Sequence, residues 1–264
     1  MNIGIVGLGL IGGSIAKRLA KCGHNLYLTD INRDVLSLAI RENKAKELLD
    51  FNSLDLVILA LPPSILLNYI EENHKRLEKT LITDVCGIKE RVEILARKYY
   101  LNYFGMHPMA GREVGGYYNS IENLFDNANL VVTNNEIPYQ INVIIKDLGF
   151  LKVMKTTSVE HDKIIAYTSQ LCHIVSNAFG KSPILDKCDG FTGGSFEDLT
   201  RVGRLDAKLW LDLFKSNREN ITNELVIFIN NLTQYKNALE SKDDNKLYEL
   251  LLNGSEILTK NKRM

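Results

Sequence analysis

The sequence predicts an α/β fold, in which a Rossmann-type, doubly wound parallel sheet domain is followed by an all-helical dimerisation domain. Three observations support this prediction. A glycine-rich nucleotide-binding signature opens the chain, short apolar strands alternate with helices as far as about residue 155, and helical periodicity alone continues after it. We therefore predict a nucleotide-binding domain over residues 1–155 and a helical substrate and dimerisation domain over residues 156–264.

The nucleotide-binding signature lies between a predicted strand and a predicted helix. Residues 2–6 form a short apolar strand, residues 7–12 read Gly-Leu-Gly-Leu-Ile-Gly, and a helical pattern with Ile15 and Leu19 follows. In this context G-x-G-x-x-G allows a tight turn, a close approach of backbone N–H groups to a pyrophosphate, and close packing of helix on strand. The residues predicted to hold the cofactor are Gly7, Gly9, Leu10, Ile11, Gly12 and Asp30.

Asp30 decides the predicted cofactor. It follows a second strand over residues 25–29 and lies eighteen residues after Gly12. An acidic side chain at this place accepts hydrogen bonds from the adenosine ribose hydroxyls and repels a 2′-phosphate. We therefore predict NAD, with NADP as the lesser alternative because Arg33 could pair with a 2′-phosphate.

Further apolar segments complete the two predicted domains. Strands are expected over residues 54–61, 81–85, 103–106, 130–133 and 149–154, with helices over residues 89–99 and 138–148. Helical periodicity then runs through residues 158–179, 207–214, 221–238 and 244–260. Because residues 221–229 are apolar on several faces, we predict a homodimer formed through the helical domain.

Composition argues against several classes of partner. The formal net charge is zero and the basic residues are dispersed, so we predict no nucleic-acid partner. No apolar run approaches membrane-spanning length and Met1 leads straight into a strand, so neither a membrane segment nor a signal peptide is expected. Four scattered cysteines are typical of reduced thiols in a cytoplasmic protein. The five histidines lack metal-ligand spacing, so we predict no metal.

Residues 105–116, Gly-Met-His-Pro-Met-Ala-Gly-Arg-Glu-Val-Gly-Gly, are the most informative stretch. They place His107 directly after a predicted strand, on a turn stiffened by proline. Ligands of doubly wound sheets bind outside the carboxyl ends of the strands, so His107 would lie beside the nicotinamide. A neutral histidine there is a natural general base for dehydrogenation. The alternative is a histidine that only caps a turn.

Motifs in both domains resemble those of the prephenate/arogenate dehydrogenases of tyrosine biosynthesis, and together they cover nearly the whole chain. They are Gly-Leu-Gly-Leu-Ile-Gly-Gly-Ser at 7–14, Asp-Val-Cys-Gly-Ile-Lys at 84–89, His-Pro-Met-Ala-Gly at 107–111, Ser-Gln-Leu-Cys-His at 169–173, Phe-Glu-Asp-Leu-Thr-Arg at 196–201, and Leu-Trp-Leu-Asp-Leu-Phe at 209–214 with Asn217. The resemblance implies NAD-dependent oxidative decarboxylation of prephenate to 4-hydroxyphenylpyruvate. Arogenate, which would give tyrosine directly, is the nearest alternative substrate.

The resemblance also implies roles for individual side chains. His107 would take the proton of the substrate 4-hydroxyl, Arg201 would bind a substrate carboxylate, and His173 would reach the substrate side chain, with Gln170 in the same pocket. The residues alone leave other readings open. Arg201 could form a helix-surface salt bridge with an acidic neighbour, and His173, on an apolar helix, could be a core or interface histidine. His161 reads as a helix-start residue.

One departure from the family pattern bears on function. Family members commonly carry a serine that contacts the substrate hydroxyl and the catalytic histidine, whereas this chain has Gly87. The Cys86 thiol, a water or a backbone N–H would have to replace that hydroxyl. Lys89 could meet a pyrophosphate or a substrate carboxylate, or simply start a helix. Arg112 and Glu113 stay unassigned.

Two alternative functions remain at this stage. Another β-hydroxyacid-type dehydrogenase or imine reductase would share the two-domain plan, but it would not explain the His-Pro-Met-Ala-Gly motif. A catalytically silent NAD-binding sensor is the alternative from a different class, and Gly87 is the feature that favours it. Retention of both His107 and Arg201 argues against a silent protein.

Overall fold

The computed structural model describes residues 1–261 and confirms the predicted fold class. The strands are β1 (Asn2–Val6), β2 (Asn25–Thr29), β3 (Lys46–Glu47), β4 (Leu56–Leu59), β5 (Ile82–Asp84), β6 (Tyr103–Pro108), β7 (Asn129–Val132) and β8 (Lys152–Lys155). The helices are α1 (Leu10–Lys21), α2 (Arg33–Asn43), α3 (Pro63–Leu77), α4 (Glu90–Lys98), α5 (Tyr139–Leu148), α6 (Ser158–Ile165), α7 (Cys172–Phe179), α8 (Gly194–Arg201), α9 (Ala207–Ser216), α10 (Arg218–Ser241) and α11 (Asp244–Lys260). Short 3-10 turns, η1 (Tyr117–Asn119) and η3 (Leu185–Lys187), and a π-helix, η2 (Ala166–Leu171), complete the described elements.

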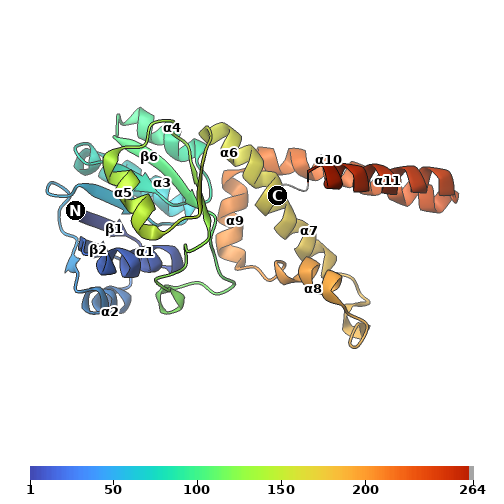
Figure 1. The fold of residues 1–264 in the computed structure, drawn as a ribbon, viewed down its shortest axis with the longest axis horizontal. Helices are drawn as coiled ribbons and strands as arrows, with labels where there is room; N and C mark the ends of the chain where they lie inside the picture. Colours follow the sequence, from blue (N-terminus) through green and yellow to red (C-terminus); the bar gives the residue numbers. More distant parts are fainter. Residues whose placement is uncertain (262–264) are drawn as a thin grey trace. The chain divides into compact units, whose positions relative to one another are not determined.

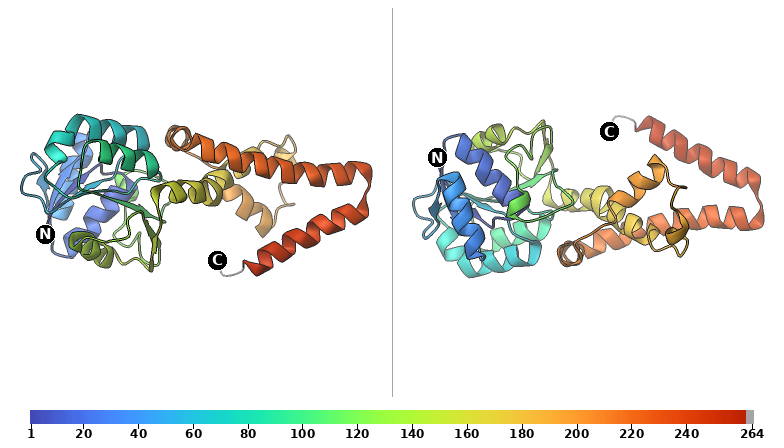
Figure 2. Two further views of the ribbon diagram at one scale, coloured as in Figure 1. Left: turned by 90° about the horizontal axis from the view of Figure 1, so that it is seen from above. Right: turned by 90° about the horizontal axis from the view of Figure 1, so that it is seen from below.

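The chain separates into two compact units. Residues 1–218 form the first unit, which contains the whole sheet and the helices up to α9 (Figure 1). The second unit begins at Glu219 and consists of nearly all of α10, which turns back into α11 (Figure 2). The sheet ends with β8 at Lys155, so the strands stop where the helical segment begins.

The eight strands form one sheet in the order β3-β2-β1-β4-β5-β6-β7-β8. Six of the seven pairings are parallel, and the pairing of β6 with β7 is antiparallel. Every residue of β4 is buried, which explains why this strand reads as a continuous apolar run. The parallel strands bring their carboxyl ends to one edge, where the glycine-rich turn, Asp84 and His107 all lie.

Apolar cores cover both faces of the sheet. On one face α1, α2 and α5 bury residues such as Ile15, Leu36 and Ile144 against the strands. On the other face α3 and α4 bury Ile70 and Val92. This two-sided cover is the doubly wound arrangement that the alternating pattern predicts.

The position of His107 differs from the prediction. It does not lie on a turn after the strand but within β6, where it pairs with Val131 of β7. The antiparallel partner extends β6 by two residues beyond Met106, and Pro108 is tolerated because it is the last residue of the strand. The pairing with β7 therefore fixes the backbone of His107, beyond the point where the pairing of β6 with β5 ends at Gly105.

The helical segment also differs in detail. The predicted helix over residues 158–179 is one continuous helical run, but α6 passes through the π-helix η2 before α7 begins. The sequence reading did not include α2, α3 and α8. Helix α3 begins at Pro63, and proline is well suited to a first helical turn. Helix α8 begins at Gly194, directly after Gly193, and is short, and none of its residues is buried.

Two other features are absent from the part of the chain that the structure describes. Within residues 1–261 no helix has the length and apolar character required to cross a bilayer. In the same residues no three His, Cys, Asp or Glu side chains gather as metal ligands would. The four cysteines are all unpaired.

A buried ion pair closes the turn between β5 and α4. The Lys89 ammonium donates to Asp84 Oδ1 at 2.5 Å, to the carbonyl oxygen of Cys86 at 2.7 Å and to that of Ile88 at 3.2 Å, and both charged side chains are fully buried. The hydroxyl of Tyr103 donates to the other carboxylate oxygen of Asp84. Lys89 is thus the N-cap residue of α4, and its side chain stabilises the turn from inside. Because the ammonium is fully buried, it is not accessible to a ligand.

We predict that Lys89→Met lowers the free energy of unfolding by about 3–5 kcal/mol, because the Asp84 carboxylate would stay buried without its counter-charge. Urea unfolding followed by circular dichroism measures the change. The exposed Lys79→Met is the matched control and should leave the midpoint nearly unchanged. Equal midpoints for the two variants would show that the buried pair does not stabilise the fold.

Candidate active site

The turn between β1 and α1 requires glycine at two of its positions. Gly7 has φ +91°, and a Cβ there would lie 2.5 Å from the carbonyl oxygen of Ala60. A Cβ on Gly12 would overlap the carbonyl oxygen of Gly7. Gly9, by contrast, faces open space. The turn therefore packs tightly against β4 while leaving its outer side accessible to a ligand.

The start of α1 has the properties of an anion site. Leu10 and Ile11 are its first residues, and Gly9 at the N-cap provides no side-chain hydrogen bond to the first backbone N–H groups. These N–H groups and the helix dipole favour a phosphate. The open side of Gly9 lies beside them, so the residues present fit a dinucleotide pyrophosphate.

Asp30 is fixed next to this turn at the end of β2. Its Oδ2 accepts a hydrogen bond from the N–H of Leu8 at 2.7 Å, and its Oδ1 accepts one from the N–H of Asn32 at 2.8 Å. Arg33, the residue that could favour NADP, forms an ion pair with Glu47 of β3 at 2.5 Å. The carboxylate of Asp30 is thus fixed beside the glycine-rich turn, and the guanidinium of Arg33 already has a carboxylate partner.

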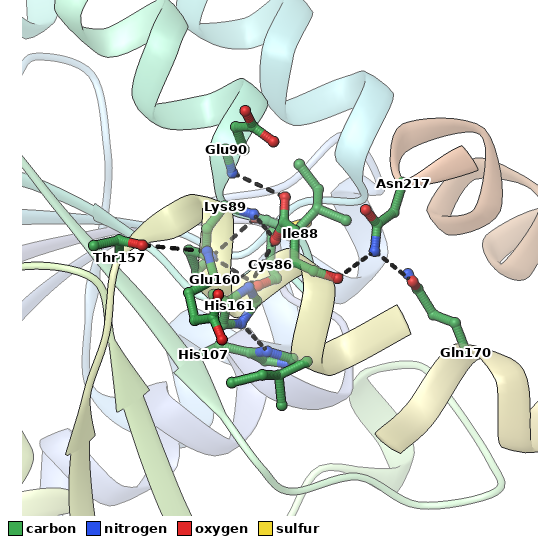
Figure 3. Close-up of polar contacts among 12 residues, drawn as sticks. Cys86, Ile88, Lys89, Glu90, His107, Thr157, Glu160, His161, Gln170 and Asn217 are labelled. Atoms are coloured by element: carbon green, nitrogen blue, oxygen red, sulfur yellow. Dashed lines mark hydrogen bonds and ion pairs between the residues drawn. The ribbon is translucent and has the colours of Figure 1, made fainter. Parts of the chain in front are cut away.

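His107 begins a chain of buried hydrogen bonds (Figure 3). His107 Nδ1 lies 2.9 Å from Nε2 of His161, and His161 Nδ1 lies 2.7 Å from Oδ1 of Asp162. His107 is half-buried, whereas His161 and Asp162 are each about 1% exposed. The two imidazoles come from β6 and α6, so the sheet and the helical segment meet at this contact.

The network determines the tautomers of both histidines. The Asp162 carboxylate only accepts, so His161 must carry its proton on Nδ1. Burial lowers the pKa of His161, which leaves its Nε2 as an acceptor. His107 therefore donates from Nδ1, and the lone pair of its Nε2 is free. Burial, followed by the neighbouring His161 and Lys89, also lowers the pKa of His107 well below 6.5, so the imidazole is a neutral base near pH 7.

Asp162 has a second task at the start of α4. Its Oδ1 accepts from the N–H of Lys89 at 2.8 Å and its Oδ2 from the N–H of Glu90 at 3.0 Å. Helix α4 lacks a side-chain cap of its own, so this carboxylate from α6 caps it instead. The same side chain thus joins two helices and orients His161.

Gly87 lies beside the free nitrogen of His107. A Cβ added to Gly87 would be 3.8 Å from His107 Nε2 and 3.2 Å from Leu213 Cδ2 of α9. The neighbouring Cys86 is buried, and burial raises the pKa of its thiol to about 12, so the thiol is neutral. Residue 87 therefore places no hydrogen-bonding side chain next to His107.

Gln170 and His173 lie on the helical run that follows α6. The side-chain amide of Asn217 donates to Gln170 Oε1 at 2.6 Å and to the carbonyl oxygen of Asp162 at 2.7 Å, so Gln170 is linked to the His107 network (Figure 3). The His173 ring packs against Trp210 with the ring centres 3.9 Å apart. Within residues 1–261 neither Gln170 Nε2 nor His173 Nδ1, both buried atoms, has a hydrogen-bond partner.

Arg201 lies apart from these hydrogen bonds. Its side chain is 63% exposed, and its ion pair, at 4.0 Å, is with Glu113 from the loop after His107 rather than with an acid of its own helix. A pocket of about 330 Å³ surrounds it, lined by Glu113, Glu197, Asp198, Thr200, Arg201 and Arg204. Neither Arg201 nor His173 is hydrogen-bonded to His107 or to its two partners within the described residues.

The sequence reading missed His161 and Asp162. His161 lies in the first turn of α6, as predicted, but its contact with His107 spans 54 residues of chain. No spacing rule connects residues so far apart. The one local signal is an adjacent histidine and aspartate directly after a predicted helix start.

Two family descriptions account for most of this chain. Residues 15–156 match the model described as prephenate dehydrogenase, nucleotide-binding domain, and residues 157–253 match the one described as prephenate dehydrogenase, dimerization domain. The chain belongs to the prephenate dehydrogenase family. The motif resemblance is therefore confirmed, and with it the class of NAD-dependent oxidoreductases.

Individual relatives of this prephenate dehydrogenase family member agree over nearly its whole length. The prephenate dehydrogenase of Lactococcus lactis subsp. cremoris is 28% identical over 271 residues, which is 96% of this chain and 75% of the relative. The prephenate dehydrogenase of A. aeolicus, solved with hydroxyphenyl propionate and NAD+, is 26% identical with a TM-score of 0.84 over 98% of both chains. The arogenate dehydrogenase of Synechocystis is 26% identical with a TM-score of 0.82, over 99% of this chain and 100% of that one.

We predict that both linked histidines of this family member are neutral at pH 7 and carry their protons on Nδ1. Nitrogen-15 NMR of the imidazoles should show this tautomer for each, with His107 titrating well below pH 6.5. Asp162→Asn should disturb both signals, because His161 loses its fixed acceptor. The exposed neighbour Glu160→Gln is the control and should leave them unchanged. A His107 signal that titrates near 6.5 would contradict the proposed network.

Proposed function

We propose that this protein is an NAD-dependent prephenate dehydrogenase, which converts prephenate to 4-hydroxyphenylpyruvate by oxidative decarboxylation. The observation that supports it most is the neutral His107. Its Nε2 makes no hydrogen bond within residues 1–261 and lies at the same edge of the sheet as the glycine-rich turn. A base and a nucleotide site at one edge are what a hydroxyl-to-carbonyl oxidation requires.

In the proposed mechanism His107 takes the proton of the 4-hydroxyl on Nε2. The positive charge that develops on its ring is stabilised through His161 by the Asp162 carboxylate, as in other carboxylate-oriented imidazoles. When bound, NAD supplies the acceptor for the hydride that leaves the carbon bearing this hydroxyl. The bond from the ring to its carboxylate breaks, its electron pair completes the aromatic ring, and carbon dioxide leaves. The phenolate oxygen then takes the proton back from His107 Nε2, which restores the neutral imidazole.

For substrate binding we assign three side chains. The exposed guanidinium of Arg201 suits bidentate binding of a carboxylate. We assign His173 to the substrate side chain, because burial lowers its pKa and its Nδ1 has no hydrogen-bond partner among residues 1–261. Gln170 belongs to the same pocket in this proposal: Asn217 occupies its Oε1, so its Nε2 is the group that a substrate oxygen would meet.

The cofactor residues in this proposal are those of the first turn. Gly7, Gly9, Leu10, Ile11 and Gly12 would hold the pyrophosphate, and Asp30 would accept hydrogen bonds from the adenosine ribose. The ion pair between Arg33 and Glu47 supports NAD over NADP, because it engages the cation that a 2′-phosphate would need.

Arogenate is the second candidate substrate, and one observation favours it. Arogenate carries an ammonium where prephenate has a keto group, so an acidic residue near Arg201 could bind its side chain. Glu113 is such a residue. His107 and Arg201 would serve both substrates equally. We rank prephenate first because its keto group is uncharged and needs no acidic side chain in the pocket, whereas the ammonium of arogenate does.

We further propose a cytoplasmic homodimer with the domain boundary at residues 155/156. The unpaired cysteines support a reducing compartment. The second unit exposes many apolar side chains, which is typical of an interface. They include Val226, Ile227, Ile229, Leu232, Leu251, Leu252, Ile257 and Leu258.

The assay of all four pairings of prephenate or arogenate with NAD or NADP tests this function. We expect the near-ultraviolet absorbance of NADH to rise fastest with prephenate and NAD. Faster turnover of arogenate would make arogenate, rather than prephenate, the preferred substrate. Protein that binds NAD but reduces it with neither substrate would instead support a silent sensor.

We predict that His107→Ala lowers kcat by about 10²–10⁴-fold, the usual contribution of a general base, while NAD affinity is nearly unchanged. Steady-state kinetics and calorimetric titration with NAD measure the two quantities. His74→Ala is the control, since His74 stacks on Tyr99 away from the site. Near-normal turnover of His107→Ala would remove this histidine from the mechanism.

Light scattering coupled to gel filtration should give a mass of twice the single-chain 29.9 kDa. The physical reason is the exposed apolar surface of the second unit, which water disfavours. Leu251→Asp with Leu258→Asp should lower this mass, whereas Lys246→Asp, an exposed polar position on the same helix, should not. A wild-type mass near one chain would overturn the homodimer.

A further inference from the structure

Glu47 lies at the edge of the sheet, next to the turn that follows β2. It is the last residue of β3, and the parallel register pairs it with Leu28, two residues before Asp30. Its Oε1 accepts a hydrogen bond from Nη1 of Arg33, the first residue of α2, at 2.5 Å. Strand β2 leads into α2 at this point (Figure 1). The guanidinium of Arg33 is therefore drawn from the turn towards the edge strand.

Backbone donors of this turn have acceptors within the chain. The N–H of Asn32 donates to Asp30 Oδ1 at 2.8 Å. The N–H groups of Asp34 and Val35 both donate to Asn32 Oδ1 at 3.1 Å. Such N–H groups are the donors that bind an anion at the start of a helix. Because these three are engaged, an anion at this turn would depend mainly on the guanidinium of Arg33.

The anion that distinguishes the two nicotinamide cofactors would meet the protein at this turn. In a dinucleotide-binding sheet the acid after the second strand, here Asp30, accepts from the 2′-hydroxyl of NAD, whereas a nearby arginine accommodates the 2′-phosphate of NADP. A phosphate monoester carries about two negative charges near pH 7 and binds best to an arginine with free N–H groups. Arg33 follows Asp30 closely enough to be that arginine, but its guanidinium is paired with Glu47.

We propose that Glu47 is a specificity-determining residue, which keeps the guanidinium of Arg33 from the 2′-phosphate of NADP and so favours NAD. This inference rests on the proposed NAD-dependent function and adds a residue to it. Asp30 repels the phosphate directly, whereas Glu47 engages the cation that would attract it. The side chains of Arg33 and Glu47 are 75% and 41% exposed, so the pair is solvated and Arg33 can turn to a phosphate once Glu47 is neutral.

Calorimetric titration with cofactors and their fragments tests this role without turnover. Glu47→Gln should tighten NADP binding by about 3- to 10-fold, the effect of releasing an exposed ion pair and removing one repelling charge. NAD affinity and the melting temperature should change little. Adenosine 2′,5′-bisphosphate should show the same gain as NADP, and adenosine 5′-monophosphate should show none, because the two fragments differ only in the 2′-phosphate. Asp30 is retained, so the preference for NAD should narrow without reversing.

Two further variants separate the ion pair from a general effect of charge. Asp34→Asn removes one negative charge from the same turn but leaves Arg33 paired with Glu47, so it should raise the affinity for NADP less than Glu47→Gln does. In an Arg33→Ala background, Glu47→Gln should lose most of its effect, because no guanidinium remains to be released. Equal gains with and without Arg33, or no gain for Glu47→Gln alone, would overturn the proposal.

Failure of this inference and failure of the proposed function give different results. Wild-type protein that binds NAD but oxidises neither prephenate nor arogenate would overturn the proposed function, whereas the binding comparison would still decide the role of Glu47. Active wild-type protein whose affinity for adenosine 2′,5′-bisphosphate is unchanged by Glu47→Gln would overturn this inference alone.

Discussion

The carboxylate of Asp162 is the interaction on which the site depends. It caps α4 through two backbone N–H groups and orients His161, which in turn orients His107. One buried carboxylate therefore both attaches α6 to α4 and fixes the tautomer of His161. A change in the position of α6 would also change the hydrogen bond that orients His107. A buried charge without such partners would be strongly unfavourable, and here the helix N-terminus and His161 together compensate it.

A buried ion pair between Asp84 and Lys89 lies in the same region. Asp84 and Lys89 pair inside the turn that carries Cys86 and Gly87, and the ammonium also binds two carbonyl oxygens of that turn. Fully satisfied buried polar groups specify one conformation, because any rearrangement leaves a charge unpaired. The turn is thereby held rigid next to His107, and residue 87 contributes no side chain there.

The helical segment completes the site from several directions. Helix α6 contributes His161 and Asp162, and the buried Gln170 lies in the π-helix that follows it. Asn217 joins Gln170 to the backbone of Asp162, and Asp212 fastens α9 to α3. Each contact spans elements that are distant in the chain, and the sheet edge is the place where they meet.

Local patterns in the sequence determined the nucleotide turn, the alternation of strands and helices and the choice of His107 as a base, because these depend on neighbouring residues and on the period of apolar positions. Only the tertiary structure decided that His107 lies within a strand, that Lys89 faces inward, and that His161 and Asp162 form a hydrogen-bonded chain with His107. The antiparallel β7, the buried charge of Asp84 and the packing of α6 decide these points, and none of them follows from local spacing. Backbone conformation is encoded over a few residues, whereas the partners of a side chain depend on which distant elements pack together.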